Sequence, residues 1–142
     1  MKEIWFDMDG TIADLYGVKN WLSMLIAEDT TPYEIARPLL RMATLARVLN
    51  GLRRKGYTIN IISWTSKGGS IEYNQAVAAA KKAWLRKHLA SVEFNRVDIV
   101  DYGTPKGEGR EGILFDDEEK NRAEWNGIAY NVTDILGVLK AL

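Results

Sequence analysis

The stretch WFDMDGTIAD, residues 5–14, ends an apolar run with two carboxylates two positions apart and follows them at once with Gly-Thr. Asp9 and Gly10 alone would be enough to turn the chain at the end of a strand. Asp7 is therefore the residue that needs a chemical explanation.

The apolar run before Asp7 is the first of five predicted strands. Each is a short segment rich in apolar or β-branched residues and bounded by turn residues. The five segments are residues 3–8, 57–63, 96–100, 112–115 and 127–132. Helical periodicity fills the intervals. The predicted helices cover residues 42–52, 70–90 with Ser70 as N-cap, 116–125 and 133–142. This alternation predicts an α/β fold with a five-stranded parallel sheet and helices on both faces.

One interval is longer than a simple crossover requires. A strand-helix-strand unit needs roughly 30 residues, whereas more than 50 separate Asp9 from the end of the second predicted strand. The surplus contains an apolar helical stripe and then TTPYE, in which Thr31 is the predicted N-cap, Pro32 the first helical residue and Glu34 the partner in a capping box. We therefore expect a small helical insertion at residues 15–38 that overhangs the strand ends.

Length and composition bound the remaining possibilities. The 142 residues suffice for one domain, residues 1–142, with a core of its own. Nineteen acidic and nineteen basic residues balance, so no overall field attracts nucleic acid or an anionic membrane. The absence of cysteine excludes thiolate catalysis and thiolate metal sites. No apolar run has the length of a signal sequence core or a membrane span, and we expect a soluble cytoplasmic protein.

The spacing of Asp7 and Asp9 suits phosphoryl transfer. One carboxylate attacks phosphorus, and the other protonates the leaving oxygen and then deprotonates water. These roles are predicted for Asp7 and Asp9, respectively. A carboxylate that approaches a phosphate dianion needs a cation beside it, and oxygen ligands favour Mg²⁺. Asp116 and Asp117 follow another predicted strand, so in a parallel sheet Asp7 and Asp116 can share one metal ion.

Phosphate oxygens also need a cation and a hydroxyl. Lys106, in the glycine-rich stretch YGTPKGEGREG, is the predicted cation, with Lys67 and Lys120 as alternatives. The hydroxyl is expected at the end of the second strand, in IISWTS. Its candidates are Thr65 first, then Ser66 and Ser63.

Together these motifs resemble those of the haloacid dehalogenase superfamily of phosphohydrolases. DMDGT, the hydroxyl that ends IISWT, Lys106 and ILFDD match its four motifs in order, over residues 4–117. The resemblance implies a Rossmann-like core and a Mg²⁺ ion held by Asp7, Asp116 and the Asp9 carbonyl. It implies that Asp117 acts through water or by steadying Lys106. The insertion lies where this family places a small cap, and DMDGTIADLY with such a cap resembles 5′(3′)-deoxyribonucleotidases.

Other candidate side chains have simpler interpretations. His88 lies on the apolar face of the long predicted helix and is interpreted as a packing residue. Core or edge packing is favoured for Trp64, and packing within the insertion for its aromatic residues, over contact with a substrate base. Those residues are Tyr16, Trp21 and Tyr33.

The sequence therefore predicts a Mg²⁺-dependent phosphatase that hydrolyses a small phosphorylated metabolite through an aspartyl-phosphate, with a nucleoside monophosphate as one candidate. A phosphatase of nucleic-acid ends is the alternative enzyme, although the chain has no basic stripe. A metal-binding regulatory protein without turnover also remains open. A phosphoryl-accepting receiver is disfavoured, because there the acidic pair follows the first strand and the acceptor the third. The substrate and the oligomeric state remain open.

Overall fold

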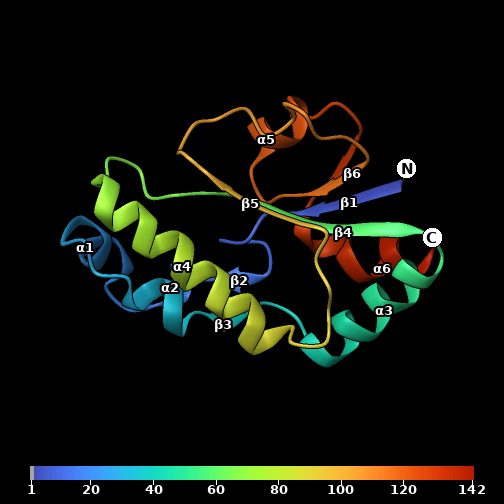
Figure 1. Cartoon of the computed structure of the whole chain (residues 1–142), viewed down its shortest axis with the longest axis horizontal. Helices are drawn as coiled ribbons and strands as arrows, with labels where there is room; N and C mark the ends of the chain where they lie inside the picture. Colours follow the sequence, from blue (N-terminus) through green and yellow to red (C-terminus); the bar gives the residue numbers. More distant parts are fainter. Residues whose placement is uncertain (1) are drawn as a thin grey trace.

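The structure, a computed structural model, describes residues 2–142 and contains a five-stranded sheet, part of which is labelled in Figure 1. The strands lie in the order β5-β4-β1-β6-β7, and all four neighbouring pairs are parallel. They are β1 (Lys2–Phe6), β4 (Tyr57–Trp64), β5 (Arg96–Val100), β6 (Ile113–Phe115) and β7 (Ile128–Tyr130). The predicted Rossmann-like α/β sheet is therefore confirmed, and β1 lies at its centre.

Three helices cover one face of this sheet. They are α3 (Met42–Arg54), α4 (Ile71–His88) and α6 (Ile135–Lys140), which lie on the same side in Figure 1. The buried leucine stripe of α3 packs with the inward residues of β1 and β4 in the largest apolar cluster. The Ser70 hydroxyl caps α4 by accepting a hydrogen bond from the Tyr73 amide at 3.1 Å, as predicted.

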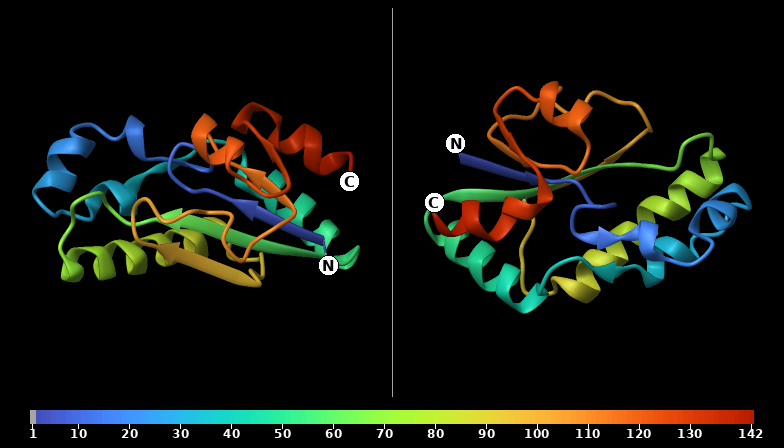
Figure 2. Two further views of the ribbon diagram at one scale, coloured as in Figure 1. Left: turned by 90° about the horizontal axis from the view of Figure 1, so that it is seen from above. Right: turned by 180° about the vertical axis from the view of Figure 1, so that it is seen from behind.

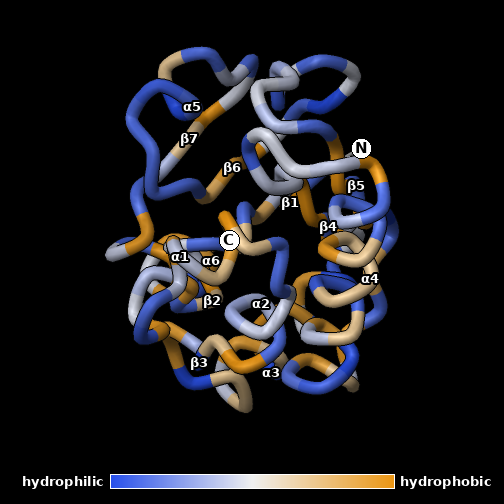
Figure 3. The backbone as a smooth tube through the Cα atoms, turned by 90° about the vertical axis from the view of Figure 1, so that its left-hand side faces the viewer, coloured by the Kyte–Doolittle hydropathy of each residue, from blue (hydrophilic) through white to orange (hydrophobic). Residues whose placement is uncertain are grey.

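The opposite face has a thinner cover. It carries the short helix α5 (Glu119–Ala123) and the 101–112 loop, which lie on the other side of the sheet from α3 and α6 (Figures 1 and 2). A smaller apolar cluster forms there around Trp5 and Trp125. The segments around α5 are mostly hydrophilic in Figure 3, whereas β6 and β7 carry hydrophobic residues. Helices thus cover both faces as predicted, but on this side a loop does much of the packing.

Residues 13–38 form a small unit beyond the carboxyl end of β1. It begins with β2 (Ala13–Asp14) and ends with β3 (Arg37–Pro38), which pair antiparallel. Between them lie η1 (Leu15–Gly17), α1 (Trp21–Ile26) and α2 (Thr31–Ile35). The two-stranded sheet was not predicted, because strands of two residues have no periodic signal.

The predicted capping box of α2 does not form. The N-cap residue is Thr30, one residue earlier than predicted, and its side chain makes no capping hydrogen bond to the backbone. The Thr30 hydroxyl donates instead to Glu34 Oε2 at 2.8 Å. The Asp29 carboxylate accepts hydrogen bonds from the Thr31 amide at 2.9 Å and from the Thr31 hydroxyl at 2.6 Å, so an aspartate binds the amide at the start of this helix.

This unit is tied to α4. Glu28 accepts hydrogen bonds from the amide and the hydroxyl of Ser70, both at 2.8 Å. Tyr73 Oη donates to the Asp29 carbonyl at 2.9 Å, and Trp84 Nε1 donates to the Ala36 carbonyl at 2.8 Å.

Within residues 2–142, no helix combines the length and the apolar character needed to cross a membrane.

Candidate active site

The first acidic pair lies in a tight loop directly after β1. The Asp7 amide continues the sheet by donating to the Phe115 carbonyl at 3.0 Å. The Met8 carbonyl then accepts three hydrogen bonds from the amides of residues 11–13 at 3.0 to 3.1 Å. Gly10 has a φ of +80°, and a Cβ there would collide with the Asp117 carboxylate. Glycine is therefore required both by the backbone and by the neighbouring acid.

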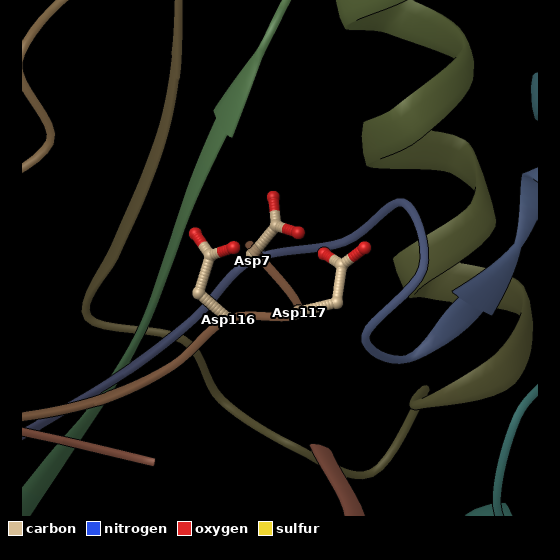
Figure 4. A group of neighbouring side chains, drawn as sticks. All are labelled: Asp7, Asp116 and Asp117. Atoms are coloured by element: carbon tan, nitrogen blue, oxygen red, sulfur yellow. The ribbon is translucent and has the colours of Figure 1, made fainter. Parts of the chain in front are cut away.

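Three carboxylates converge at this edge of the sheet. Asp7 follows β1, while Asp116 and Asp117 follow β6, which pairs with β1 so that Phe6 is opposite Phe115. One carboxylate oxygen from each of the three lies within 4.8 Å of the others, and Figure 4 shows the side chains pointing toward one another. Asp7 of the first predicted pair thus meets both acids of the second, whereas the Asp9 carboxylate lies outside this cluster.

Lys106 lies between the two most buried of these acids. Its Nζ donates to Asp7 Oδ1 at 2.9 Å and to Asp116 Oδ2 at 2.8 Å, and its side chain is 4% exposed. Burial alone would lower the pKa of Lys106, but the charges of Asp7 and Asp116 raise it above its usual range. Lys106 is therefore charged at any physiological pH. Two other lysines were alternatives for this role. Lys67 lines the same cavity as Lys106, which is described below, and Lys120 is exposed on α5.

Hydrogen bonds from α5 and the loop before it orient Asp116. Its Oδ1 accepts from the Glu118 amide at 2.9 Å, and its Oδ2 accepts from Asn121 Nδ2 at 3.2 Å. Burial and the nearby Asp7 charge nevertheless raise the pKa of Asp116 to about 6. Sequence reasoning missed Asn121, whose only signal was its position five residues after Asp116.

Asp117 interacts with Thr11 rather than with Lys106. The Thr11 hydroxyl lies 3.0 Å from Asp7 Oδ2 and 3.3 Å from Asp117 Oδ1, and it accepts from the Asp117 amide at 3.3 Å. Burial and repulsion by Asp7 raise the pKa of Asp117 to about 7. Thr11 thus links the two acidic loops.

A second buried lysine, which sequence reasoning missed, pairs with Asp9. Lys81 projects from α4 and is 1% exposed. Its Nζ donates to Asp9 Oδ2 at 2.8 Å, to Ser63 Oγ at 2.7 Å and to the Trp64 carbonyl at 2.6 Å. Burial raises the pKa of Asp9 in spite of the opposing charge of Lys81.

The three candidate hydroxyls at the end of β4 have different surroundings. Ser63 is bound to Lys81, and it does not line the cavity described below. Ser66 and Thr65 both line it. Thr65 Oγ1 is buried and has no hydrogen-bond partner among residues 2–142. A buried hydroxyl is costly to leave without a partner, so Thr65 is poised for a ligand.

These groups open into a cavity of about 440 Å³. Its inner wall contains Asp7, Asp9, Thr65 and Lys106. Its outer wall is apolar and aromatic, with contributions from residues 15–38 and from the loops after β4 and β5. The aromatic residues of the lining are Tyr16, Trp21, Tyr33, Trp64 and Tyr102. His88 lies outside this lining and packs against Trp84 with 4.4 Å between ring centroids, in agreement with its predicted packing role.

The ionised site carries a surplus of negative charge. The site contains four aspartates, residues 7, 9, 116 and 117. Within residues 2–142, their ion pairs are to two lysines, Lys81 and Lys106. Four negative and two positive charges leave a balance of minus two. Carboxylate oxygens are the donors that Mg²⁺ prefers, so the cluster of Asp7, Asp116 and Asp117 fits a divalent cation in both charge and chemistry.

Comparison with known proteins adds evidence about the fold. No family model and no curated protein sequence matches the chain. Among solved structures, the D,D-heptose 1,7-bisphosphate phosphatase from Burkholderia thailandensis superimposes with a TM-score of 0.50. The match covers 87% of this chain and 70% of that one, at 16% sequence identity. This likeness shows the shared fold, a Rossmann-like α/β core of the kind that the resemblance to the haloacid dehalogenase superfamily predicts.

Proposed function

We propose that this protein is a Mg²⁺-dependent phosphatase that hydrolyses a small phosphomonoester through an aspartyl-phosphate on Asp7. One observation carries the proposal: the Asp7 carboxylate, the Lys106 ammonium and the unpartnered Thr65 hydroxyl line the same cavity. A nucleophile, a cation and a hydroxyl donor are the groups that an incoming phosphoryl group requires. The shared fold with a sugar-phosphate phosphatase is consistent with this activity.

The proposed metal ligands are the carboxylates of Asp7 and Asp116 and the main-chain carbonyl of Asp9. Asp117 belongs to the same acidic cluster but pairs with Thr11 and not with Lys106, which favours a role through water. A divalent cation held there neutralises charge on the phosphoryl oxygens and lowers the repulsion of the attacking carboxylate.

The reaction has two displacements at phosphorus. In the first, a carboxylate oxygen of Asp7 attacks, the bond between phosphorus and the ester oxygen breaks, and Asp9 donates a proton to the leaving alkoxide. In the second, Asp9 removes a proton from water, whose oxygen attacks phosphorus and releases phosphate and free Asp7. Lys106 and Thr65 hold the phosphoryl oxygens throughout. The raised pKa of Asp9 supports its role as the acid.

The cavity supports a compact substrate with a flat or apolar part. Its volume of about 440 Å³ lies within the usual range of small-molecule sites. We assign residues 15–38 the role of a small cap, because Tyr16, Trp21 and Tyr33 line the cavity from that segment. Leu22 and Ile26 of this segment also line the cavity and are 55% and 75% exposed, so the cavity is open to solvent on this side. A nucleoside monophosphate fits this description, with its base against the aromatic outer wall.

The direct test is phosphate release from a panel of nucleoside monophosphates, sugar phosphates and p-nitrophenyl phosphate. Each substrate is assayed with Mg²⁺ and with EDTA, and Asp7→Asn serves as the blank. We expect magnesium-dependent phosphate release that disappears in Asp7→Asn. We also expect faster hydrolysis of esters that carry an aromatic ring or a nucleobase than of sugar phosphates. Absence of release from every substrate, with Mg²⁺ binding intact, would favour the regulatory alternative.

A further inference from the structure

Lys81 has the geometry of a fixed anchor. It lies in the middle of α4, with its side chain directed away from solvent. An ammonium group has three N–H donors, and all three are used, by Asp9 Oδ2, Ser63 Oγ and the Trp64 carbonyl. Two of these three acceptors belong to β4, so the ammonium is held against the sheet.

The consequence for Asp9 is a restricted carboxylate. Its Oδ2 is occupied by Lys81 at 2.8 Å, while its side chain remains 19% exposed and lines the cavity. Asp9 lies in a loop, where a free carboxylate would sample several rotamers. Because Oδ2 is bound to the Lys81 ammonium, which is itself held against β4, Oδ1 is the oxygen left to face a ligand.

The two lysines of the site have separate partners. Lys106 pairs with Asp7 and Asp116, whereas Lys81 pairs with Asp9. Lys81 also lies 5.1 Å from the ring centroid of Tyr33, which belongs to residues 15–38 and is 5% exposed. The ammonium is thus enclosed by β4, α4 and this segment, and a phosphoryl group in the cavity has no open path to it.

We infer that Lys81 is a positioning residue that fixes the Asp9 carboxylate so that one oxygen faces the leaving-group oxygen of the substrate. This inference rests on the proposed function, in which Asp9 is the acid and base. Because Lys81 acts through Asp9, its removal should affect the proton transfer step rather than substrate binding. Esters with poor leaving groups need that proton most.

The test compares Lys81→Met with Lys82→Met, the same change at the next residue of α4, where the side chain is exposed. The kcat/KM of Lys81→Met, which reports only the first displacement, is expected to fall about 100-fold for an alkyl phosphate and less than about tenfold for p-nitrophenyl phosphate. Lys82→Met should match the wild type on both esters. An equal fall in kcat/KM on both esters in Lys81→Met would overturn the positioning role.

A double variant separates positioning from general loss of structure. In an Asp9→Asn background, Lys81→Met should cause no further fall in kcat for the alkyl phosphate, since the group that it positions is gone. Losses that multiply would show that Lys81 acts independently of Asp9 and would overturn the inference.

Ser63→Ala provides a milder probe, because Lys81→Met leaves a buried hydroxyl and a buried carbonyl without their donor. It removes one hydrogen-bond acceptor of Lys81 and keeps the pair with Asp9, and we expect a two- to fivefold fall in kcat/KM confined to the alkyl phosphate. A uniform fall contradicts positioning. If the wild-type protein hydrolyses no ester, both the proposed function and the positioning role of Lys81 are contradicted. If the wild type is active and the Lys81 and Ser63 variants lose activity equally on all esters, only the positioning role is contradicted.

Discussion

The two buried lysines of the site perform similar chemistry from different parts of the fold. Lys106 lies in the glycine-rich 101–112 loop, where the buried Arg110 holds it by donating to the Lys106 carbonyl at 3.1 Å. Lys81 lies within the regular helix α4. Each ammonium neutralises an acid of the β1 loop: Lys106 pairs with Asp7, and also with Asp116, whereas Lys81 pairs with Asp9. Asp7 and Asp9 thus belong to two separate hydrogen-bonded units, although the charge of Asp7 still contributes to the raised pKa of Asp9.

The largest expected effect concerns the acids themselves. Asp7→Asn should lower turnover of every ester by about 10⁴-fold or more, because the covalent step is lost. Its melting temperature should not fall, since the change leaves Lys106 paired with Asp116 and removes a repulsive charge. Phosphate release and thermal unfolding measure the two properties.

Asp9→Asn is the matched variant on the Lys81 side. Its loss in kcat/KM, which reports the first displacement, should be large for alkyl phosphates and small for p-nitrophenyl phosphate. If the two variants showed the same dependence on the leaving group, the separation between the two units would be wrong.

The next effect is removal of the loop lysine. Lys106→Met should lower turnover by about 10²- to 10³-fold on all esters alike, because the lost cation stabilises phosphoryl oxygens rather than the leaving group. In EDTA it should also destabilise the fold by about 3 to 5 kcal/mol, since two buried acids lose their counter-charge. Urea unfolding with and without Mg²⁺ measures this effect.

Lys120→Met, an exposed lysine on α5, is the control for Lys106→Met and should change neither property. Recovery of most of the lost stability with Mg²⁺ is expected in Lys106→Met, because a cation then replaces the ammonium charge. Full stability of this variant in EDTA would show that Lys106 does not hold the acids together.

A smaller effect distinguishes the two hydroxyls beside these lysines. Thr65→Val should lower turnover about tenfold and raise stability by about 1 kcal/mol, because the hydroxyl that it removes is buried and has no hydrogen-bond partner among residues 2–142. Ser63→Ala should instead lower stability by about 1 kcal/mol, since Lys81 loses an acceptor. Urea unfolding of both variants measures these opposite changes in stability, and kinetics measures the change in turnover.

The smallest effect is a pH dependence of the metal-free protein. The raised pKa values of Asp116, about 6, and Asp117, about 7, mean that the folded state binds more protons than the unfolded state between about pH 4 and 7. Stability in EDTA should therefore decrease as the pH rises through this window, and Asp9 shifts in the same direction. Urea unfolding at pH 5 and pH 8 measures the slope.

Two control experiments show which groups cause this dependence of stability on pH. Asp117→Asn should reduce it, and saturating Mg²⁺ should reduce or reverse it, because the cation favours the ionised acids. The lowered pKa of His88, caused by burial and then by Lys87, works in the opposite direction near pH 6. A steeper slope in His88→Gln is therefore consistent with this account, whereas an unchanged slope in Asp117→Asn contradicts it.

Much of the core was predictable because its signals are local. The five strands are short apolar segments between turn residues, and their alternation with helices implies parallel pairing. The edge of the sheet where Asp7 and Asp116 meet follows from that pairing alone. Lys106 was the first choice because of its place in the glycine-rich loop and its match to the third motif of the resemblance, but Lys67 and Lys120 remained alternatives.

Lys81 could not be predicted for the opposite reason. It lies in AAAKKAW, where Lys81 and Lys82 both read as ordinary polar residues of a helix, and only the rotation of α4 against the sheet buries one and exposes the other. The choice among Ser63, Thr65 and Ser66 has the same origin. Ser63 lies in β4 and is bound by Lys81, whereas Thr65 and Ser66 follow the strand, so the position of Lys81 and the path of the chain after β4 decide which hydroxyl lacks a partner. Both depend on tertiary packing.

The pairing of β2 with β3 has a consequence for protein engineering. Ala13 lies opposite Pro38 and Asp14 opposite Arg37, so the chain leaves the core and returns to it at neighbouring points. Segments with adjacent ends can be exchanged at little cost in loop closure. The ends of residues 15–36 therefore suit an exchange of this segment between proteins of the same fold. A grafted segment must keep the ring of Tyr33 beside Lys81 and the hydrogen bonds to α4 and its N-cap if the acidic centre is to stay intact.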